Sequence, residues 1–347
     1  MNFEKIENLI EQAIQDKVFP CAAVAIGKGN EVYWKKSFGN AQLFPEIHPL
    51  TDNTLFDTAS LSKVIGTTMV AFKAIEQGKL CLDDTLNRFF EHTYDKGEIT
   101  IQNLLTHTSG IASHMPLYLM NITPEQAVDT ILKQDFAYQT NADVQYSCMG
   151  YIILGKLLEQ VLGDTLDQLV KKHVFEPLGM KTACYLPTAT SVAAIDVVAT
   201  EYAEDVGGYV KGIVHDENAR FLGGVSGNAG IFATLDDMIA FATMLSNRGK
   251  GYLSNRMFEK AIQNYTHGLS ENRGLGFALS GDIPNFAGDL FAEGSYGHTG
   301  FTGTSVMVDK DTGLYTILLT NRVHFGRENN GIIRFRKQFH NAILAEV

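Results

Sequence analysis

The sequence predicts a two-lobed α/β protein, in which an antiparallel sheet built from both ends of the chain adjoins a mostly helical lobe. Three observations predict this class. Short apolar runs around a turn follow the first helix, helical periodicity fills the middle, and further short apolar runs fill the last third. We expect the outer sets to share one sheet within a single domain, residues 1–347. The predicted sheet lobe is 1–56 and 225–347, and the helical lobe is 57–224.

The composition describes a globular protein with excess negative charge. The chain has 347 residues, of which 45% are hydrophobic, which is enough to bury a large core. Its formal net charge of -11, without any run of lysine or arginine, repels a phosphate backbone and argues against nucleic acid as a partner. No apolar run approaches the roughly 20 residues that span a bilayer, so we expect no membrane span.

The N-terminus and the cysteines indicate the compartment. Acidic residues stand where a signal peptide would be apolar, so we expect a cytoplasmic protein. Cys21, Cys81, Cys148 and Cys184 form no C-x-x-C pair and are expected to be small, buried, reduced thiols. The ten histidines include no metal-ligand spacing such as H-E-x-x-H. We therefore expect neither a metal nor another cofactor.

The first elements are a helix and a hairpin. Phe3, Ile6, Leu9 and Ile10 lie on one helical stripe at the N-terminus. Apolar runs at 21–27 and 31–39 then flank a short turn at 28–30, which is a β-hairpin signal.

The middle of the chain is predicted to be mainly helical. A buried helix spans 64–75 and stops at Gly78. The following segments are expected to be a short helix at 99–110 ended by Gly110, helices from 122 to 174 with an apolar face closed by Gly163, loops at 187–225, and a helix at 236–245.

The last third returns to strands. They are predicted at 275–279, 295–298, 304–309 and 315–320, with a hairpin turn at 310–313 and a closing helix at 329–344.

The stretch that starts at Ser60 carries candidate chemistry. Ser60 and Lys63 are three residues apart, so on a helix both side chains lie on one face. In an apolar setting Lys63 can lose its proton near neutral pH and then accept the proton of Ser60. Free N–H groups at the helix N-terminus favour a developing oxyanion. The alternative is a lysine that reaches from a helix end to solvent beside a serine cap.

Two further stretches complete a family pattern. Tyr146-Ser147-Cys148 places a tyrosine just before a helix, and His298-Thr299-Gly300 lies at the end of a strand. Together with Ser60-Leu61-Ser62-Lys63, they resemble the three motifs of the serine β-lactamase and penicillin-binding protein superfamily. The similarity is to its class C β-lactamase-like branch, which includes esterases and D-amino-acid peptidases. The order matches over nearly the whole chain, which implies the β-lactamase/transpeptidase-like fold, an antiparallel sheet flanked by terminal helices.

The resemblance implies acyl transfer through a covalent acyl-enzyme. Ser60 would be the nucleophile, and Lys63 and Tyr146 would share the proton transfers. The backbone N–H groups of Ser60 and Phe301 would form the oxyanion hole. His298 and Thr299 would orient the substrate and help to hold Tyr146, and Gly300 belongs to the same substrate-binding motif.

Cys148 and His298 modify this expectation. The family usually has asparagine where this chain has Cys148, so a weak donor replaces an amide that would bind Lys63 and the substrate. Cys148 as a rival nucleophile is the lesser alternative. His298 gives less fixed positive charge than a lysine at pH 7, which favours esters or neutral amides over substrates with a free carboxylate.

Other polar residues receive structural interpretations. His107 is expected to fix a helix end beside the site, and His215-Asp216-Glu217 is expected to be a solvated loop rather than a metal site. Arg322 is expected to form a strand-end salt bridge, with anion binding as the alternative. Ser226-Gly227-Asn228 lies among glycines, which favours a tight backbone passage.

The sequence therefore predicts a serine hydrolase of the class C β-lactamase-like type, acting without a cofactor on a small ester or amide, with weak β-lactam hydrolysis. The alternative is a non-catalytic or slowly acylated sensor for β-lactam or peptidoglycan-type ligands. The sequence does not specify the substrate or the oligomeric state.

Overall fold

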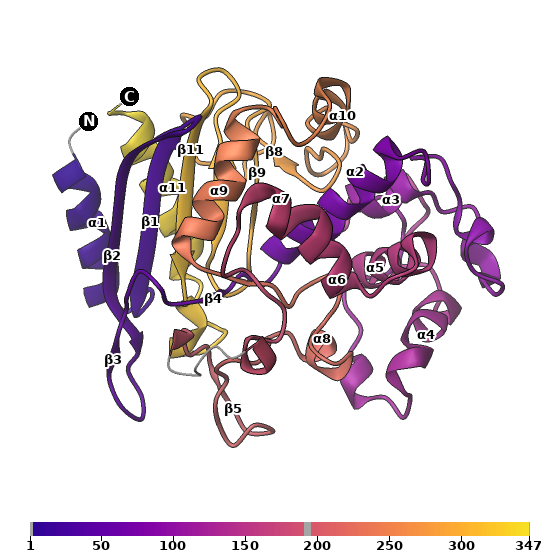
Figure 1. The fold of residues 1–347 in the computed structure, drawn as a ribbon, viewed down its shortest axis with the longest axis horizontal. Coiled ribbons are helices and arrows are strands. Elements are labelled where there is room, and N and C mark those ends of the chain that lie inside the picture. Colours follow the sequence, from indigo (N-terminus) through magenta and orange to yellow (C-terminus); the bar gives the residue numbers. More distant parts are fainter. Residues whose placement is uncertain (1–2, 191–195, 347) are drawn as a thin grey trace.

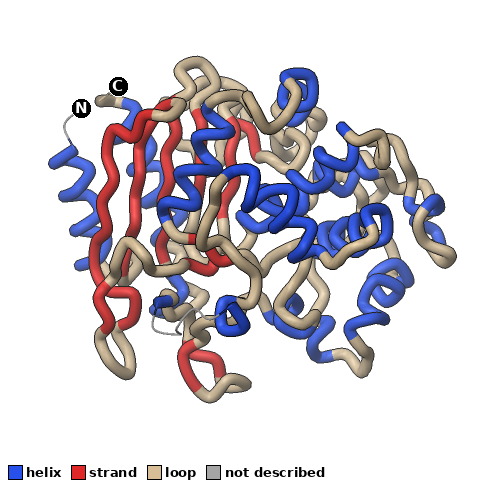
Figure 2. The backbone as a smooth tube through the Cα atoms, in the orientation of Figure 1, coloured by secondary structure: helices blue, strands red, loops and turns tan. Residues whose placement is uncertain are grey.

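A computed structural model describes residues 3–190 and 196–346 of the protein. Its main sheet has seven strands in the order β3-β2-β1-β11-β10-β9-β8 (Figures 1 and 2). The strands are β1 (Cys21–Lys28), β2 (Glu31–Gln42), β3 (His48–Pro49), β8 (Ala278–Leu279), β9 (Tyr296–Thr299), β10 (Ser305–Val308) and β11 (Leu314–Thr320). All neighbours in it are antiparallel, and β1 pairs with β11 with Val24 opposite Leu318. The expected sharing of one sheet by the two ends of the chain is confirmed.

Helices cover both faces of the sheet. The terminal helices α1 (Phe3–Gln15) and α11 (Gly331–Leu344) lie side by side on one face, and α9 (Leu235–Ser246) lies on the other (Figure 1). Successive side chains of a strand point to opposite faces, so Val24 packs with the terminal helices while Ala23 and Ala25 join the core beneath α9. Burial of each large apolar side chain contributes about 1.5–3 kcal/mol, so both faces are firmly anchored.

The remaining elements form a helical region beside the sheet and two small sheets. The helices are α2 (Thr68–Glu76), α3 (Ile101–Thr106), α4 (Ala127–Lys133), α5 (Cys148–Leu162), α6 (Leu166–Val170), α7 (Glu176–Leu178), α8 (Glu217–Phe221) and α10 (Asn255–Ala261). The two-stranded sheets pair β4 (Phe56–Asp57) with β7 (Phe232–Ala233), and β5 (Tyr202–Ala203) with β6 (Gly208–Tyr209). The division into lobes at 56/57 and 224/225 stays a prediction.

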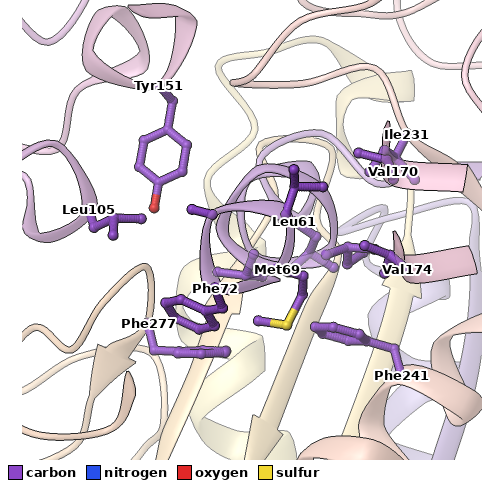
Figure 3. Close-up of a cluster of buried hydrophobic side chains, with 14 of the residues drawn as sticks. Leu61, Met69, Phe72, Leu105, Tyr151, Val170, Val174, Ile231, Phe241 and Phe277 are labelled. Atoms are coloured by element: carbon purple, nitrogen blue, oxygen red, sulfur yellow. The ribbon is translucent and has the colours of Figure 1, made fainter. Parts of the chain in front are cut away.

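The helix after Ser60 is buried on nearly all sides, as its sequence predicts. It begins with a π-helical turn at Lys63–Thr67, continues as α2 and ends before Gly78, whose φ is 69°. The π-helical turn differs from the α-helix that the spacing predicts. Figure 3 shows the apolar side chains packed around it, from both the sheet side and the helical side: Leu61, Met69, Phe72, Leu105, Tyr151, Val170, Val174, Ile231, Phe241 and Phe277.

Several predicted boundaries are wrong. Helix α3 ends before His107, which adopts a left-handed conformation with φ 59°, rather than at Gly110. The helical prediction fails between α4 and α5 because that segment bonds to the loop after α3, as in Gln145 N to His107 O. The predicted strand 275–279 shortens to β8, since Gly276 has φ 82°.

The predicted loop 187–225 and the predicted burial of the cysteines are also partly wrong. The loop contains β5, β6 and α8. Cys21 is buried, but Cys81 is exposed because it lies in the turn that follows α2. Among the described helices, none combines the length and the apolar character needed to cross a membrane.

Candidate active site

Ser60 lies in a tight turn between β4 and the π-helical turn. Ala59 before it has φ 48°, a left-handed conformation that an L-residue adopts only when its surroundings impose it. The buried Asp57 imposes it here, since its carboxylate accepts the N–H of Ala59 at 2.8 Å and that of His215 at 2.7 Å. The turn thus presents Ser60 to the cleft, whose lining includes it.

Lys63 is fully buried behind Ser60. Its Nζ donates to Ser60 Oγ at 3.0 Å, to the carbonyl oxygen of Asn228 at 2.8 Å and to Cys148 Sγ at 3.5 Å. Burial lowers the pKa of Lys63, but Cys148 and Tyr146, in their ionised forms, raise that pKa more, and it lies above the ordinary lysine value. Because Tyr146 is itself neutral in the free protein, this rise does not fix the charge of Lys63 at neutral pH, and loss of its proton there stays a prediction.

Tyr146 lies directly over Lys63. Its ring centroid is 4.9 Å from Lys63 Nζ, 4.5 Å from the His107 ring and 5.8 Å from the His298 ring. Its hydroxyl is buried and close enough to Lys63 and Ser60 to interact with both, but it makes no hydrogen bond of good geometry among residues 3–190 and 196–346. Burial raises the pKa of Tyr146, and the charge of Lys63 only partly opposes this, so the phenol is neutral in the free protein.

His107 and the start of α5 fix the position of Tyr146. Ser147 caps α5 by accepting the N–H of Gly150 at 3.0 Å. The N–H of Ser147 donates to His107 Nδ1 at 3.0 Å. The expectation that His107 fixes a helix end beside the site is confirmed, because this ring joins the end of α3 to the start of α5.

His298 and Thr299 end β9 at the cleft. Burial lowers the pKa of His298 well below its ordinary value, and the charges of Arg273 and Lys63 lower it further. The ring is therefore neutral at pH 7, and its Nδ1 lies 2.8 Å from the Thr299 carbonyl oxygen. Gly300 follows where a Cβ atom would lie 2.5 Å from the Thr58 carbonyl oxygen. Only glycine lets this turn approach the Ser60 segment so closely.

Two backbone donors remain unused near Ser60. Among the described residues, neither the N–H of Ser60 nor that of Phe301 donates to a backbone or side-chain acceptor. Both residues line the cleft, and an oxyanion hole requires two such free N–H groups at the position where the oxyanion forms.

The cleft has a volume of about 340 Å³. Its lining contains Ser60, Tyr146, His298, Thr299, Gly300 and Phe301, together with Arg273, Ala278, Phe286, Arg322, Asn330, Ile332, Ile333 and Arg336. Lys63 and Cys148 stand behind Ser60 and do not line it. The structure thus brings together the three sequence segments identified from their motifs.

Sequence reasoning missed two of the three arginines of the cleft, Arg273 and Arg336, and gave Arg322 anion binding only as the alternative to a salt bridge. Arg273 lies over the Tyr146 ring at 5.6 Å and bonds to Glu271 through Nε at 2.8 Å. Arg322 and Arg336 come from the end of β11 and from α11. Because the three lie on separate segments, no local spacing marks them as a group.

Two structural interpretations from the sequence are wrong. His215 is buried instead of solvated, lies 3.0 Å from a Glu201 oxygen and stacks on the Phe301 ring at 5.6 Å. Burial raises the pKa of Glu201, but hydrogen bonds from His215 and Arg327 outweigh it and bring that pKa to about 2. Arg322 forms no salt bridge within the described part of the chain; its Nε donates to the Phe301 carbonyl oxygen at 2.9 Å.

The tight backbone passage at Gly227 is confirmed. A Cβ atom there would overlap the Tyr151 carbonyl oxygen of α5. This close approach places the Asn228 carbonyl oxygen within hydrogen-bond distance of Lys63 Nζ. Because the acceptor is a main-chain group, no side-chain motif in the sequence predicts this contact. Within residues 3–190 and 196–346, no group of three or more His, Cys, Asp or Glu side chains is arranged to hold a metal ion.

Comparisons with known proteins agree with this fold and these motifs. The Beta-lactamase family model matches residues 6–340. A putative D-alanyl-D-alanine carboxypeptidase of Salmonella typhimurium is 28% identical over 360 residues, covering 92% of this chain and 82% of the relative.

Solved structures show the same fold. EstCE1, described as a hydrolase with promiscuous acyltransferase activity, superposes with a TM-score of 0.80 at 23% identity, covering 98% of each chain. The octameric penicillin-binding protein homologue from Pyrococcus abyssi superposes with a TM-score of 0.79 at 21% identity, covering 99% of this chain and 78% of that one. With the family model spanning nearly the whole sequence, the chain belongs to the Beta-lactamase family, within the serine β-lactamase and penicillin-binding protein superfamily of serine hydrolases.

Proposed function

We propose that the protein is a class C β-lactamase-like hydrolase that cleaves small esters or amides through an acyl-enzyme on Ser60. The observation that carries this proposal is the 3.0 Å hydrogen bond from Lys63 Nζ to Ser60 Oγ at the edge of a cleft. The Ser60 oxygen attacks the carbonyl carbon, its proton passes to the Lys63–Tyr146 pair, and the leaving group departs with a proton from that pair. Water then hydrolyses the acyl-enzyme by the same route.

The Ser60 and Phe301 N–H groups receive the negative charge of the tetrahedral intermediate in this proposal. Loss of one such donor typically costs about 3 kcal/mol of the barrier. His298 and Thr299 align the substrate along the edge of β9, and Gly300 lets that edge approach Ser60. Cys148 occupies the place of an amide and offers only a weak donor, so we expect slow turnover of β-lactams.

The arginines of the cleft change the expected substrate charge. His298 is neutral, as argued above, but Arg273, Arg322 and Arg336 line the same cleft. Of these, only Arg273 has a carboxylate partner among the described residues. A guanidinium matches a carboxylate in geometry and charge, so an acyl donor with a carboxylate fits this cleft as well as a neutral ester does. The relative named as a putative D-alanyl-D-alanine carboxypeptidase supports such a substrate, and EstCE1, described as a hydrolase with promiscuous acyltransferase activity, supports acyl transfer.

The test is acylation of Ser60. The purified protein is offered p-nitrophenyl esters of short acids, a depsipeptide with a free carboxylate and a fluorescent penicillin, and intact mass spectrometry follows the adduct. We expect turnover and a transient adduct that Ser60→Ala abolishes. Ser37→Ala, on β2 and outside the cleft lining, serves as the matched control and should retain the wild-type rate.

The outcomes distinguish the proposed hydrolase from a slowly acylated sensor or a pure binding protein. Unchanged activity in Ser60→Ala would remove Ser60 from the mechanism. An adduct that persists for hours with every donor would instead favour the slowly acylated sensor, and no adduct with any donor would favour a pure binding protein.

A further inference from the structure

The turn that carries Phe301 is held by two buried arginines. Arg336, on α11, donates through its Nη2 to the carbonyl oxygens of Gly300 and Thr304, each at 3.0 Å. Arg322, at the end of β11, donates through Nε to the carbonyl oxygen of Phe301 at 2.9 Å. The two guanidinium groups therefore bind adjacent carbonyl groups of one turn.

The carbonyl groups of Gly300 and Phe301 belong to different peptide units. The Gly300 carbonyl and the Phe301 N–H are the two ends of one peptide group. The Phe301 carbonyl belongs to the next one. A cation that binds a peptide oxygen draws electron density through the amide and makes the N–H of the same group a stronger donor. Of the two arginines, only Arg336 acts in this way on the Phe301 N–H; the Gly300 carbonyl also accepts the uncharged Gly303 N–H at 3.1 Å.

The charge of Arg336 has no counterion in the described part of the chain. The side chain is only 7% exposed, and its Nε has no partner there. Burial lowers the pKa of Arg336 to about 9, so the guanidinium is charged at neutral pH. A buried, uncompensated charge costs several kcal/mol, and packing alone does not require one at this position. The nearest polar groups are the two carbonyl groups of the turn.

We propose that Arg336 is a positioning residue that strengthens the Phe301 N–H as an oxyanion donor by binding the carbonyl of the same peptide group. This inference rests on the proposed function for its catalytic consequence. The polarisation itself is a property of the free protein and is measured without any substrate.

The first measurement is hydrogen exchange of the Phe301 amide by NMR. Phe301 is 46% exposed and its N–H is unpaired within the described residues, so its base-catalysed exchange reports the acidity of the amide. We expect Arg336→Met to slow this exchange about tenfold, because a nearby cation favours the deprotonated amide. Arg322→Met is the matched control: it removes a charge from the same turn but from the neighbouring peptide group, and the exchange should change less than about twofold.

The second measurement is the rate of Ser60 acylation. With a neutral p-nitrophenyl ester as the substrate, we expect Arg336→Met to slow acylation by tenfold to a hundredfold with little change in KM, which is part of the loss typical of a removed oxyanion donor. Arg336→Lys, which keeps the charge, should recover most of both effects. If Arg336→Met does not fold, Arg336→Gln takes its place against Arg336→Lys.

Each outcome decides one proposal. Unchanged exchange at Phe301 in the neutral variants overturns the polarisation, whatever the activity. Slower exchange together with wild-type acylation shows that the polarised N–H is not used and also overturns the inference. Slower exchange in a protein whose Ser60 is never acylated defeats the proposed function and leaves the polarisation standing.

Discussion

At the scale of residues, the candidate site depends on a coupled pair of titratable groups, Lys63 and Tyr146. Burial raises the pKa of Tyr146, so its phenol is neutral, whereas burial lowers the pKa of Lys63 and the negative charges of ionised Cys148 and Tyr146 raise it. The pair can accept the proton of Ser60 only in the form that has lost one proton of its own. Such a pair titrates as a unit, so the proton that is lost belongs to the pair and not to one of its members.

The rate of acylation should therefore depend on pH. Below the pKa of the pair, kcat/KM should rise about tenfold for each pH unit, because the base form of the pair becomes more abundant. The measurement is the pH profile of p-nitrophenyl ester hydrolysis from pH 6 to 9, with the Ser60→Ala background subtracted. Tyr146→Phe, which leaves Lys63 alone, should shift the profile; a flat wild-type profile would contradict the prediction.

The sequence predicts residues of the site only where they lie in a motif. Ser60, Lys63, Tyr146 and His298 follow from short patterns, and the structure places them together, although their roles stay predictions. Arg273 and Arg336 could not be found this way, since each stands alone in its segment and acquires its meaning from tertiary contacts.

At the scale of elements, the glycine segment before β7 sets the geometry of Lys63. Gly227 passes against the backbone of α5, opposite Gly155, whose own Cβ would lie 2.9 Å from the Gly227 Cα. This contact fixes the Asn228 carbonyl oxygen at 2.8 Å from Lys63 Nζ. Two glycines therefore bring a backbone oxygen to a buried ammonium.

Gly227→Ala should harm both stability and activity. The new methyl group overlaps the Tyr151 carbonyl oxygen, so the segment must move, at a cost of about 1–3 kcal/mol in the free energy of unfolding, and the Asn228 carbonyl leaves Lys63. Urea unfolding and the acylation rate measure the two effects. Gly150→Ala on α5 is the control, since its Cβ meets Leu104 at an ordinary 3.5 Å; an equal loss there would refute the steric explanation.

Helix boundaries could be predicted where a local residue sets them. Gly163 caps α5 in a left-handed conformation with φ 76°, as its position predicts. The end of α3 could not be predicted, because His107 adopts the left-handed conformation while its ring bonds to the distant Ser147. Tertiary contacts decide such cases, and they are invisible in a local pattern.

At the scale of the whole molecule, several buried histidines make the fold sensitive to acid. Burial lowers the pKa of His107 and His298 well below the ordinary value and that of His340 to about 4. As the pH falls below about 6.5, the unfolded chain binds protons on these rings and the folded chain does not. Stability is therefore lost with falling pH.

The free energy of unfolding should fall by about 1.4 kcal/mol for each of these rings between pH 7.5 and 5.5. Glu201 does not oppose this, because the stability from its lowered pKa is complete above about pH 4.5 and is lost only toward pH 2. Urea unfolding at both pH values provides the measurement, and His340→Gln should reduce the difference. Equal or greater stability at pH 5.5 would contradict the assignment of neutral rings.

The overall architecture could be predicted because apolar runs at both ends of the chain have no other partner. The hairpin of β1 and β2 and the strands β10 and β11 follow from local alternation. The strand order of the sheet and the small strands β3, β4 and β7 do not, since two-residue strands carry no periodicity and arise from contacts with distant segments.

The pairing of β1 with β11 also orders the events of biosynthesis. Strand β1 is synthesised well before its neighbour β11, and Phe301 and Arg336 likewise follow Ser60 and Lys63 by a long stretch of chain. A nascent or C-terminally truncated polypeptide that already holds Ser60 and Lys63 thus lacks both an anchored nucleophile turn and the donor opposite it. The proposed hydrolytic activity should therefore appear only once the segment that carries β11 and α11 has been synthesised and has packed.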